Sequence, residues 1–294
     1  MTRTGSSART GGRKGRVSAR AAGPATNPAA PGQIGGAYKP LTDRELKAIY
    51  KTALRLLSQL GMGEVPHDLE RLFLGAGAFL NDKGRTCFPA AMVEEAIGKA
   101  AKRFTLHARD PDRSIEVGGE QVHFGTGGAA VQTLDLNTQR YRPSTLTDLY
   151  DFTRLQDTLT NISWFTRCCV ATDVPGELDL DVNTVFALLK GTTKPVATSF
   201  TLAENVAPIV DMLDIAEGAK GAFSRRPYIK AHISPVISPM RYGADAVDVT
   251  LACIKHNIPL SCITAAQSGA TAPARRHPAF PADWMWMPRA ASNL

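Results

Sequence analysis

The sequence lacks any apolar run long enough to cross a membrane. No stretch approaches the roughly 18 consecutive apolar residues that a transmembrane helix requires, and no charged segment followed by an apolar one opens the chain as in a secretory signal. Cysteines are also scarce, and their unpaired spacing fits neither a zinc site nor a disulfide framework; they are Cys87, Cys168, Cys169, Cys253 and Cys262. We therefore expect a cytoplasmic protein with free thiols, no metal site and no association with a membrane.

Acidic residues are absent from the first 42 positions, which carry seven basic ones. The rest of the chain holds 27 basic and 27 acidic residues, so the net charge of +7 belongs to this segment. Residues 1–36 are rich in Gly, Ala, Ser, Thr and Pro and poor in large apolar side chains, so they cannot bury enough surface to offset the entropy lost on ordering. We predict a disordered basic tail there. Because no aromatic residues interleave with its charges, we expect no nucleic-acid partner.

Residues 37–145 show helical patterns followed by short strand patterns. Thr42-Asp-Arg-Glu45 is a capping box, and apolar residues at three- and four-residue steps continue the helix as far as Gly61. Two further helices are predicted after Pro66 and at Pro89. Short alternating segments then predict an antiparallel meander, and they lie at 104–108, 114–117, 121–124 and 131–134. We interpret this region as an N-terminal helical and β-meander cap rather than the main sheet.

From residue 146 to residue 274, helical patterns alternate with apolar strand-like runs. A helix from Thr147 to Leu159 starts the series. The strand markers that follow are 32, 33 and 31 residues apart, which is the length of a βαβ unit, and they are Trp164, Val196, Ile229 and Leu260. Strands this apolar must be covered by helices or closed into a barrel. The fold class is therefore α/β, as the first half of a (β/α)8 TIM-type barrel or as an open doubly wound sheet.

Glycine patterns favour the barrel. No strand of the 146–274 region is followed by G-x-G-x-x-G at the start of a helix, the loop that cradles phosphates in dinucleotide-binding sheets. The glycine cluster Gly125-Thr-Gly-Gly128 follows a meander strand instead. We interpret this cluster as a tight turn and keep ligand binding as the alternative.

Four ordered segments between about Gly35 and Ala274 carry a family resemblance. They are Gly35-Gly-Ala-Tyr-Lys-Pro-Leu41, Phe104-Thr-Leu-His-Ala-Arg-Asp-Pro111, Phe124-Gly-Thr-Gly-Gly128 and Ser268-Gly-Ala-Thr-Ala-Pro273. Together they resemble the trimethylamine methyltransferase family. The resemblance implies a (β/α)8 barrel and a methyl transfer from a methylated amine, either trimethylamine or a betaine such as glycine betaine, to a corrinoid (cobalamin) carried by a partner protein.

Polar and aromatic residues near the carboxyl ends of the predicted strands are the candidate ligands, because parallel sheets bind ligands at that edge. An amine cation would be held by a carboxylate and an aromatic face, which Asp173 and Phe200 provide. A betaine carboxylate would be held by Arg167 or His232, and Gln267 follows the fourth strand. Two alternatives stay open: Asp173 can cap the turn that follows it, and His232 can be a satisfied core histidine. The sequence identifies no catalytic residue.

Residues 275–294 show neither a helical nor a strand period, and they hold two of the three tryptophans. We interpret them as an aberrant terminus outside the family pattern, and 146–274 as a C-terminally truncated barrel. An open sheet edge would remain, so homo-oligomerisation stays open. The alternative to an active methyltransferase is an inactive remnant or a non-catalytic, partner-binding member of the same family.

Overall fold

The computed structural model describes residues 13, 17, 27 and 30–263. Most of the predicted tail, the fourth resemblance segment, Gln267 and the predicted aberrant terminus at 275–294 lie outside the described residues. None of the described helices is long and apolar enough to span a membrane.

The three helices predicted at the N-terminal side are confirmed. Helix α2 (Asp43–Arg55) begins at the predicted capping box, in which the Glu45 N–H donates to the Thr42 hydroxyl and the Thr42 N–H donates to the Glu45 carboxylate. It runs into a π-helical turn, η1 (Leu56–Leu60), that ends at Gly61 with a φ of +70°. Helices α3 (His67–Gly75) and α4 (Ala90–Lys99) follow Pro66 and Pro89.

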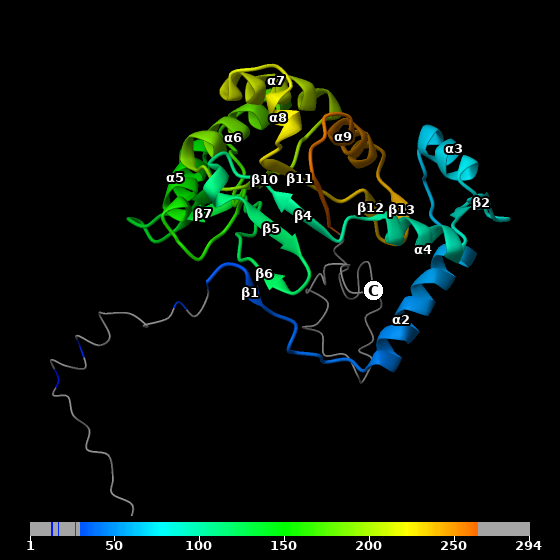
Figure 1. Cartoon of the computed structure of the whole chain (residues 1–294). Coiled ribbons are helices and arrows are strands. Elements are labelled where there is room, and N and C mark those ends of the chain that lie inside the picture. Colours follow the sequence, from blue (N-terminus) through cyan, green and yellow to red (C-terminus); the bar gives the residue numbers. More distant parts are fainter. Residues whose placement is uncertain (1–12, 14–16, 18–26, 28–29, 264–294) are drawn as a thin grey trace, which may run out of the picture.

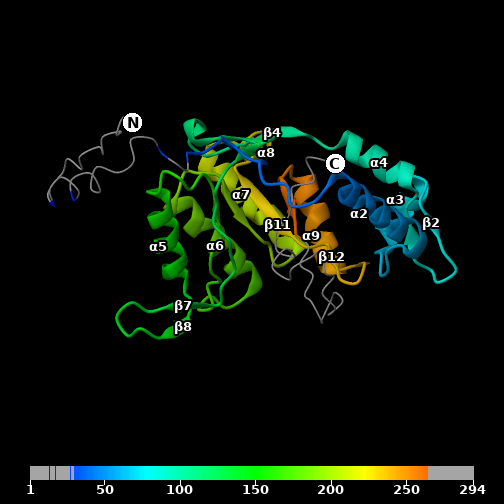
Figure 2. The ribbon, with the colours of Figure 1, turned by 90° about the horizontal axis from the view of Figure 1, so that it is seen from below.

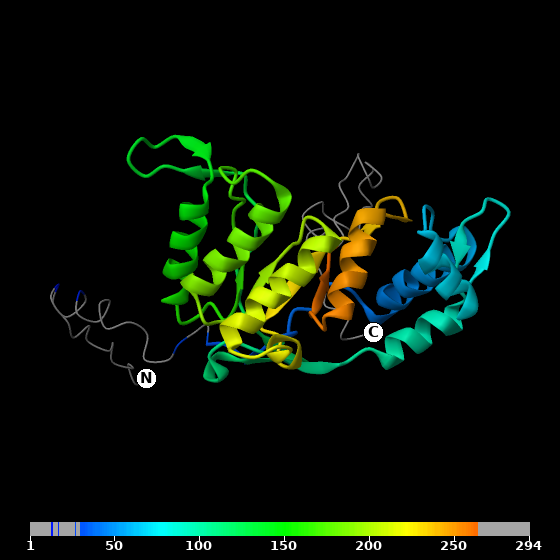
Figure 3. The ribbon, with the colours of Figure 1, turned by 90° about the horizontal axis from the view of Figure 1, so that it is seen from above.

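These helices form a small unit with its own apolar core at one side of the molecule, next to α9 (Ala244–Lys255) in Figures 1 and 3. The hairpin of β2 (Phe79–Leu80) and β3 (Thr86–Cys87) belongs to it. Met62, Ala78 and Phe88 form the buried core, against which the hairpin of β12 (Val236–Ile237) and β13 (Arg241–Tyr242) packs. Arg85 donates to the Met240 carbonyl at 2.8 Å, which ties the unit to the 236–242 hairpin.

The predicted strands between residues 103 and 134 are present, but they do not form one meander. They pair as separate two-stranded ladders: β4 (Arg103–Leu106) with β5 (Ile115–Gly118) across the 3-10 turn η2 (Pro111–Arg113), β6 (Gln121–Val122) with β1 (Gln33–Ile34), and β7 (Gln132–Leu134) with β8 (Tyr141–Pro143). Strand β1 lies in the stretch predicted to be disordered, so that prediction was too broad. Gly35 allows this pairing, because a Cβ there would lie 2.5 Å from the Val122 side chain.

The main sheet has four parallel strands in the order β14, β11, β10, β9. The strands are β9 (Phe165–Thr166), β10 (Val196–Thr198), β11 (Ile229–Ile233) and β14 (Leu260–Cys262). The predicted alternation of strands and helices is confirmed by α5 (Leu146–Asp157), α6 (Glu177–Gly191), η3 (Ala203–Asn205) with α7 (Val206–Glu217), α8 (Ala222–Arg225) and α9.

The large helices cover one face of this sheet. Figure 1 shows α5, α6, α7 and α9 in an arc over the strands, and Figure 3 shows the same helices side by side from above. Buried side chains such as Phe165, Val196, Ile229, Leu188 and Leu213 fill the space between helices and sheet. The strand order follows the chain without reversal. Among the described residues the sheet is open, so it forms no closed barrel.

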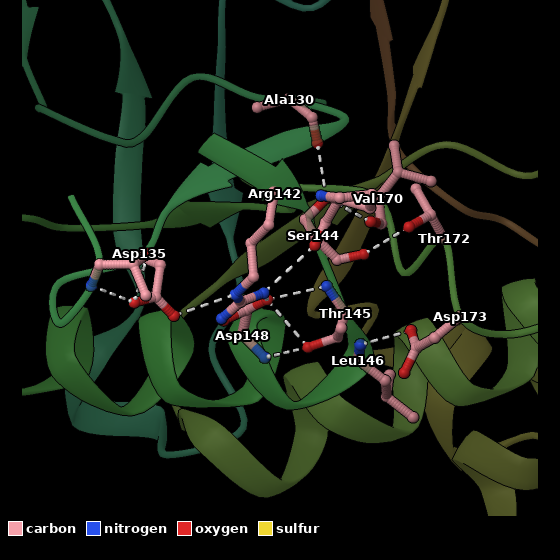
Figure 4. Close-up of polar contacts among 12 residues, drawn as sticks. Ala130, Asp135, Arg142, Ser144, Thr145, Leu146, Asp148, Val170, Thr172 and Asp173 are labelled. Atoms are coloured by element: carbon pink, nitrogen blue, oxygen red, sulfur yellow. Dashed lines mark hydrogen bonds and ion pairs between the residues drawn. The ribbon is translucent and has the colours of Figure 1, made fainter. Parts of the chain in front are cut away.

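Helix α5 is fixed by a polar network at its N-terminus (Figure 4). Its N-cap is Thr145, whose hydroxyl accepts from the Asp148 N–H, while Asp148 accepts from the Thr145 N–H at 2.8 Å. The predicted start at Thr147 was therefore two residues late, because Asp148 completes a capping box with Thr145. Arg142 donates two hydrogen bonds to Asp148, at 2.6 and 2.8 Å, and holds the pKa of that carboxyl down at about 2. The hairpin of β7 and β8 that carries Arg142 projects beyond α5 in Figure 2.

Candidate active site

A cavity of about 310 Å³ lies at the carboxyl ends of the parallel strands. Residues at the ends of all four strands contribute to it, together with the segment that precedes β7. The lining residues are Thr126, Gly127, Gly128, Ala129, Trp164, Thr166, Arg167, Thr198, Ser199, His232 and Ile263. The cavity therefore occupies the edge of the sheet at which the strand-end argument placed a ligand.

Strand alternation decides which side chains face this side of the sheet. Along β11, Ile229, Ala231 and Ile233 are buried against the helices, so Lys230 and His232 stand on the opposite face. The register pairs Ala197 with both Thr166 and Lys230, which places those three residues on the face away from the helices. The face away from the helices thus carries two basic side chains on one strand.

The glycine cluster forms one wall of the cavity. Thr126 donates to the Thr166 carbonyl at 2.9 Å, and the Ala130 N–H donates to the Cys168 carbonyl at 3.1 Å, so the segment runs alongside β9. A Cβ on Gly128 would lie 1.9 Å from the Arg167 carbonyl oxygen. Glycine is needed there because the two backbones approach so closely. The cluster lines a cavity as well as shaping the chain, and ligand binding by it stays a prediction.

Arg167 contributes a guanidinium with free donors. It makes no side-chain hydrogen bond or ion pair with any other described residue. Burial lowers the pKa of this guanidinium, and the negative charge of Asp181 opposes that shift. Asp181 itself is engaged elsewhere, since it accepts from Thr201 and from the Asn205 side chain at 2.7 to 2.9 Å. Within the described structure the five N–H donors of Arg167 are therefore available to a ligand.

His232 is a neutral imidazole. Burial, followed by the positive charges of Lys230 and Arg167, lowers its pKa to about 4. Its Nε2 lies 3.3 Å from the Thr166 hydroxyl, and its Nδ1 is buried without a hydrogen-bond partner in the described structure. The interpretation of His232 as a satisfied core histidine is therefore only half met, because one ring nitrogen keeps its hydrogen-bonding capacity.

Trp164 and Lys230 were not among the predicted site residues. The Lys230 ammonium lies over the Trp164 ring, 3.9 Å from its centroid, and the Trp164 ring lies 6.2 Å from that of His232. Both residues precede the ends of their strands, so a search for residues at strand ends passes over them. Strand alternation is the signal that finds them: Lys230 shares its face with His232, and Trp164 shares its face with Thr166.

The structure does not bring Asp173 or Phe200 to this cavity. Asp173 accepts from the Leu146 N–H at 2.8 Å, so it caps α5 (Figure 4), and Phe200 is buried in the main apolar core. Gln267 lies outside the described residues. The described lining contains Arg167 and His232 but no Asp or Glu. Within the described chain, no group of three or more His, Cys, Asp and Glu side chains is placed to hold a metal ion.

A second cavity, of about 430 Å³, lies at the opposite ends of the strands. Three of its charged side chains have protein partners: Asp157 accepts from Arg113 and from the Thr192 hydroxyl, and Lys194 donates to the carbonyls of Gln156 and Leu159. Such a network holds the loops in place and engages the Arg113, Asp157 and Lys194 charges within the protein, whereas Arg167 at the carboxyl ends has no such partner among the described residues. The cavity at the carboxyl ends is therefore the candidate active site.

Sequence comparisons relate this chain to a known protein family. The family model described as trimethylamine methyltransferase (MTTB) matches residues 9–280. Trimethylamine methyltransferase MttB of Desulfitobacterium hafniense (strain DSM 10664 / DCB-2) is 26% identical over 231 residues, which are 78% of this chain and 46% of that protein. Glycine betaine methyltransferase of Desulfitobacterium hafniense (strain Y51) is 22% identical over 244 residues, which are 83% of this chain and 50% of that protein.

Trimethylamine methyltransferase MttB1 of Methanosarcina mazei is 25% identical over 236 residues, covering 79% of this chain and 48% of that protein. The chain thus spans about half the length of the curated relatives it matches. The residues matched by the family model include all four strands of the parallel sheet, the candidate site and the N-terminal unit. The chain belongs to the trimethylamine methyltransferase family.

Proposed function

We propose that this chain forms the substrate-binding part of a methyltransferase that moves a methyl group from a methylated amine to the corrinoid of a partner protein. The observation that carries the proposal is the cavity at the carboxyl ends of the parallel strands. There a guanidinium with no partner among the described residues, a neutral imidazole and an indole ring meet in a chain of this family. Methylated amines and betaines are the substrates named in its relatives.

The sheet is the first half of a (β/α)8 barrel in this proposal. Two features support it: the strands follow one another in chain order, and the large helices lie over one face. A doubly wound sheet reverses its strand order at a switch point and carries helices on both faces. The described sheet has no such reversal, and its large helices lie on one face. The face away from the helices would then point toward the barrel interior.

The charges of the cavity favour a betaine over trimethylamine. A trimethylammonium cation in this cavity would meet Arg167, and Lys230 stands over the ring of the lining residue Trp164, without a counter-charge among the described lining residues. A betaine carries a carboxylate, and an arginine fork holds a carboxylate through two parallel hydrogen bonds. The volume of about 310 Å³ lies at the small end of the range of about 300–1,000 Å³ for small-molecule sites. It is far too small for a corrinoid, which fits a methyl donor inside and an acceptor that approaches from outside.

Each side chain has a distinct task in this arrangement. Arg167 anchors the carboxylate, and Trp164 offers an aromatic face to the methylated ammonium. His232 stays uncharged at neutral pH, so it can hydrogen-bond the substrate without repelling the ammonium. The corrinoid of the partner protein supplies the reduced cobalt that accepts the methyl group. The protein residues bind and orient the donor, and no proton transfer is required of them.

A methyl-transfer assay tests the proposal. The chain is mixed with a reduced corrinoid protein and with trimethylamine, glycine betaine, carnitine or proline betaine, and the cobalt absorbance is followed. The proposal predicts methylation of the corrinoid with at least one betaine, and slower or no reaction with trimethylamine. Absence of methyl transfer from every amine contradicts the methyltransferase assignment, and reaction with trimethylamine alone contradicts the betaine assignment.

A further inference from the structure

The Trp164 ring offers two faces, and both are occupied within the described structure. Gly125 presses against the ring so closely that a Cβ there would lie 2.0 to 2.5 Å from three of its carbon atoms. The Lys230 ammonium stands over the ring at 3.9 Å from its centroid. Two groups this close cannot share one face, so the backbone of Gly125 covers one and Lys230 the other. The face taken by Lys230 is the one that a ligand can reach by displacing a side chain.

Lys230 is held there without a counter-charge from the part of the chain that the structure describes. Its ammonium has no hydrogen bond or ion pair with any other described residue. The titratable and charged groups around it are His232 on the same strand, Arg167 after β9 and His123 beside Trp164. None of these three is a carboxylate. An ammonium buried against an indole ring in such surroundings is stabilised mainly by the ring itself.

We propose that Lys230 controls access of methylated ammonium groups to Trp164, because the lysine ammonium and the ligand ammonium compete for the same ring face. A cation binds well only when Lys230 has lost its proton or has moved off the ring. The proposal rests on the proposed function, since it concerns how the same cavity admits its substrate. It also assigns Lys230 a specificity role: a ligand with a carboxylate offsets the positive charge, whereas a simple cation does not.

A pH dependence follows from this competition. Burial lowers the pKa of Lys230 to about 8, so the neutral form makes up about 10% of the molecules at pH 7 and about 90% at pH 9. Apparent affinity scales with the fraction of binding-competent protein, so a simple quaternary ammonium should bind about tenfold more tightly at pH 9 than at pH 7. His232 does not titrate in this window, because its pKa is about 4. Arg167 keeps its charge throughout.

The test is calorimetric titration of the full chain with tetramethylammonium, a permanent cation without a carboxylate, between pH 6.5 and 9.5. The wild type should gain affinity with rising pH. Lys230→Met should bind tightly at every pH, about tenfold more tightly than the wild type at pH 7. Lys230→Arg should bind weakly at every pH, because the guanidinium keeps its charge. Lys255→Met, an exposed lysine of α9, is the matched control and should follow the wild-type profile.

Three results would overturn the proposal: a flat wild-type profile, a Lys230→Met variant that binds no more tightly than the wild type at pH 7, or tetramethylammonium binding that survives Trp164→Leu. The wild-type profile needs no substitution, so it stays decisive even if a variant fails to fold. Failure of the proposed function is a separate result. A chain that binds tetramethylammonium with the expected profile but methylates no corrinoid supports the role of Lys230 and contradicts the methyltransferase assignment.

Discussion

Replacing Arg167 by Met removes the one guanidinium that lines the described cavity and keeps a side chain of similar length and volume. Because no described side chain hydrogen-bonds to Arg167, the substitution breaks no such bond, and Asp181, whose charge acts on Arg167, keeps its hydrogen bonds from Thr201 and Asn205. The substitution should therefore reduce the free energy of ligand binding. Hydrogen bonds to charged groups contribute about 1.5–3 kcal/mol, which corresponds to a weakening of glycine betaine binding by about 10- to 150-fold. Calorimetric titration at pH 7.5 measures it.

The same variant should treat a simple amine differently. Trimethylamine has no carboxylate, and removing a positive charge from the cavity reduces its repulsion, so its affinity should stay equal or rise. Arg154→Met, on the exposed side of α5, is the matched control and should leave both affinities unchanged. If a folded Arg167→Met chain loses less than about threefold in glycine betaine affinity, the assignment of Arg167 as the carboxylate anchor is refuted.

Three further predictions concern stability and titration. Asp148→Asn should lower the free energy of unfolding, measured with urea, by about 1–3 kcal/mol at neutral pH. In the wild type this contribution is present above about pH 4 and is lost as the pH falls toward 2, because Arg142 lowers the pKa of Asp148. A variant whose stability falls between pH 4 and pH 2 as much as that of the wild type refutes this prediction. Gly128→Ala should melt at a lower temperature and weaken glycine betaine binding, since its Cβ would meet the Arg167 carbonyl oxygen at 1.9 Å; wild-type melting and affinity would show that the backbones can separate. His232 should stay neutral in NMR titration until the pH approaches 4. The unfolded chain takes up this proton near pH 6.5, so the folded state should lose stability as the pH falls below about 6.5. A titration midpoint of His232 near 6.5 in the folded protein contradicts its burial.

Most of the fold that could be predicted from the sequence was predicted from signals that lie within a few residues of each other. The capping box at Thr42, the prolines before α3 and α4, and the regular spacing of apolar runs each specify an element through contacts within a few residues. Pairing between distant segments was not predictable in this way. Strand β1 pairs with β6 through backbone hydrogen bonds that leave no hydrophobic pattern, so Gln33–Ile34 looked like part of a disordered tail.

The candidate site shows the same division. Arg167 and His232 were found because parallel strands end at a common edge, a rule that depends on topology alone. Asp173 and Phe200 also follow strand ends. However, the Asp173 carboxylate accepts a hydrogen bond from the first turn of α5, and the Phe200 ring is buried in the apolar core. Sequence position does not distinguish these outcomes, since the direction of a side chain beyond a strand end depends on the loop that follows.

A crystal structure of the chain with glycine betaine bound tests the central claim most directly. The account predicts one molecule in the cavity at the carboxyl ends of β9, β10, β11 and β14, with its carboxylate in hydrogen-bonding contact with Arg167 and its trimethylammonium group against Trp164, from which Lys230 has moved away. Glycine betaine bound elsewhere, or bound in this cavity with its carboxylate away from Arg167, would contradict the account.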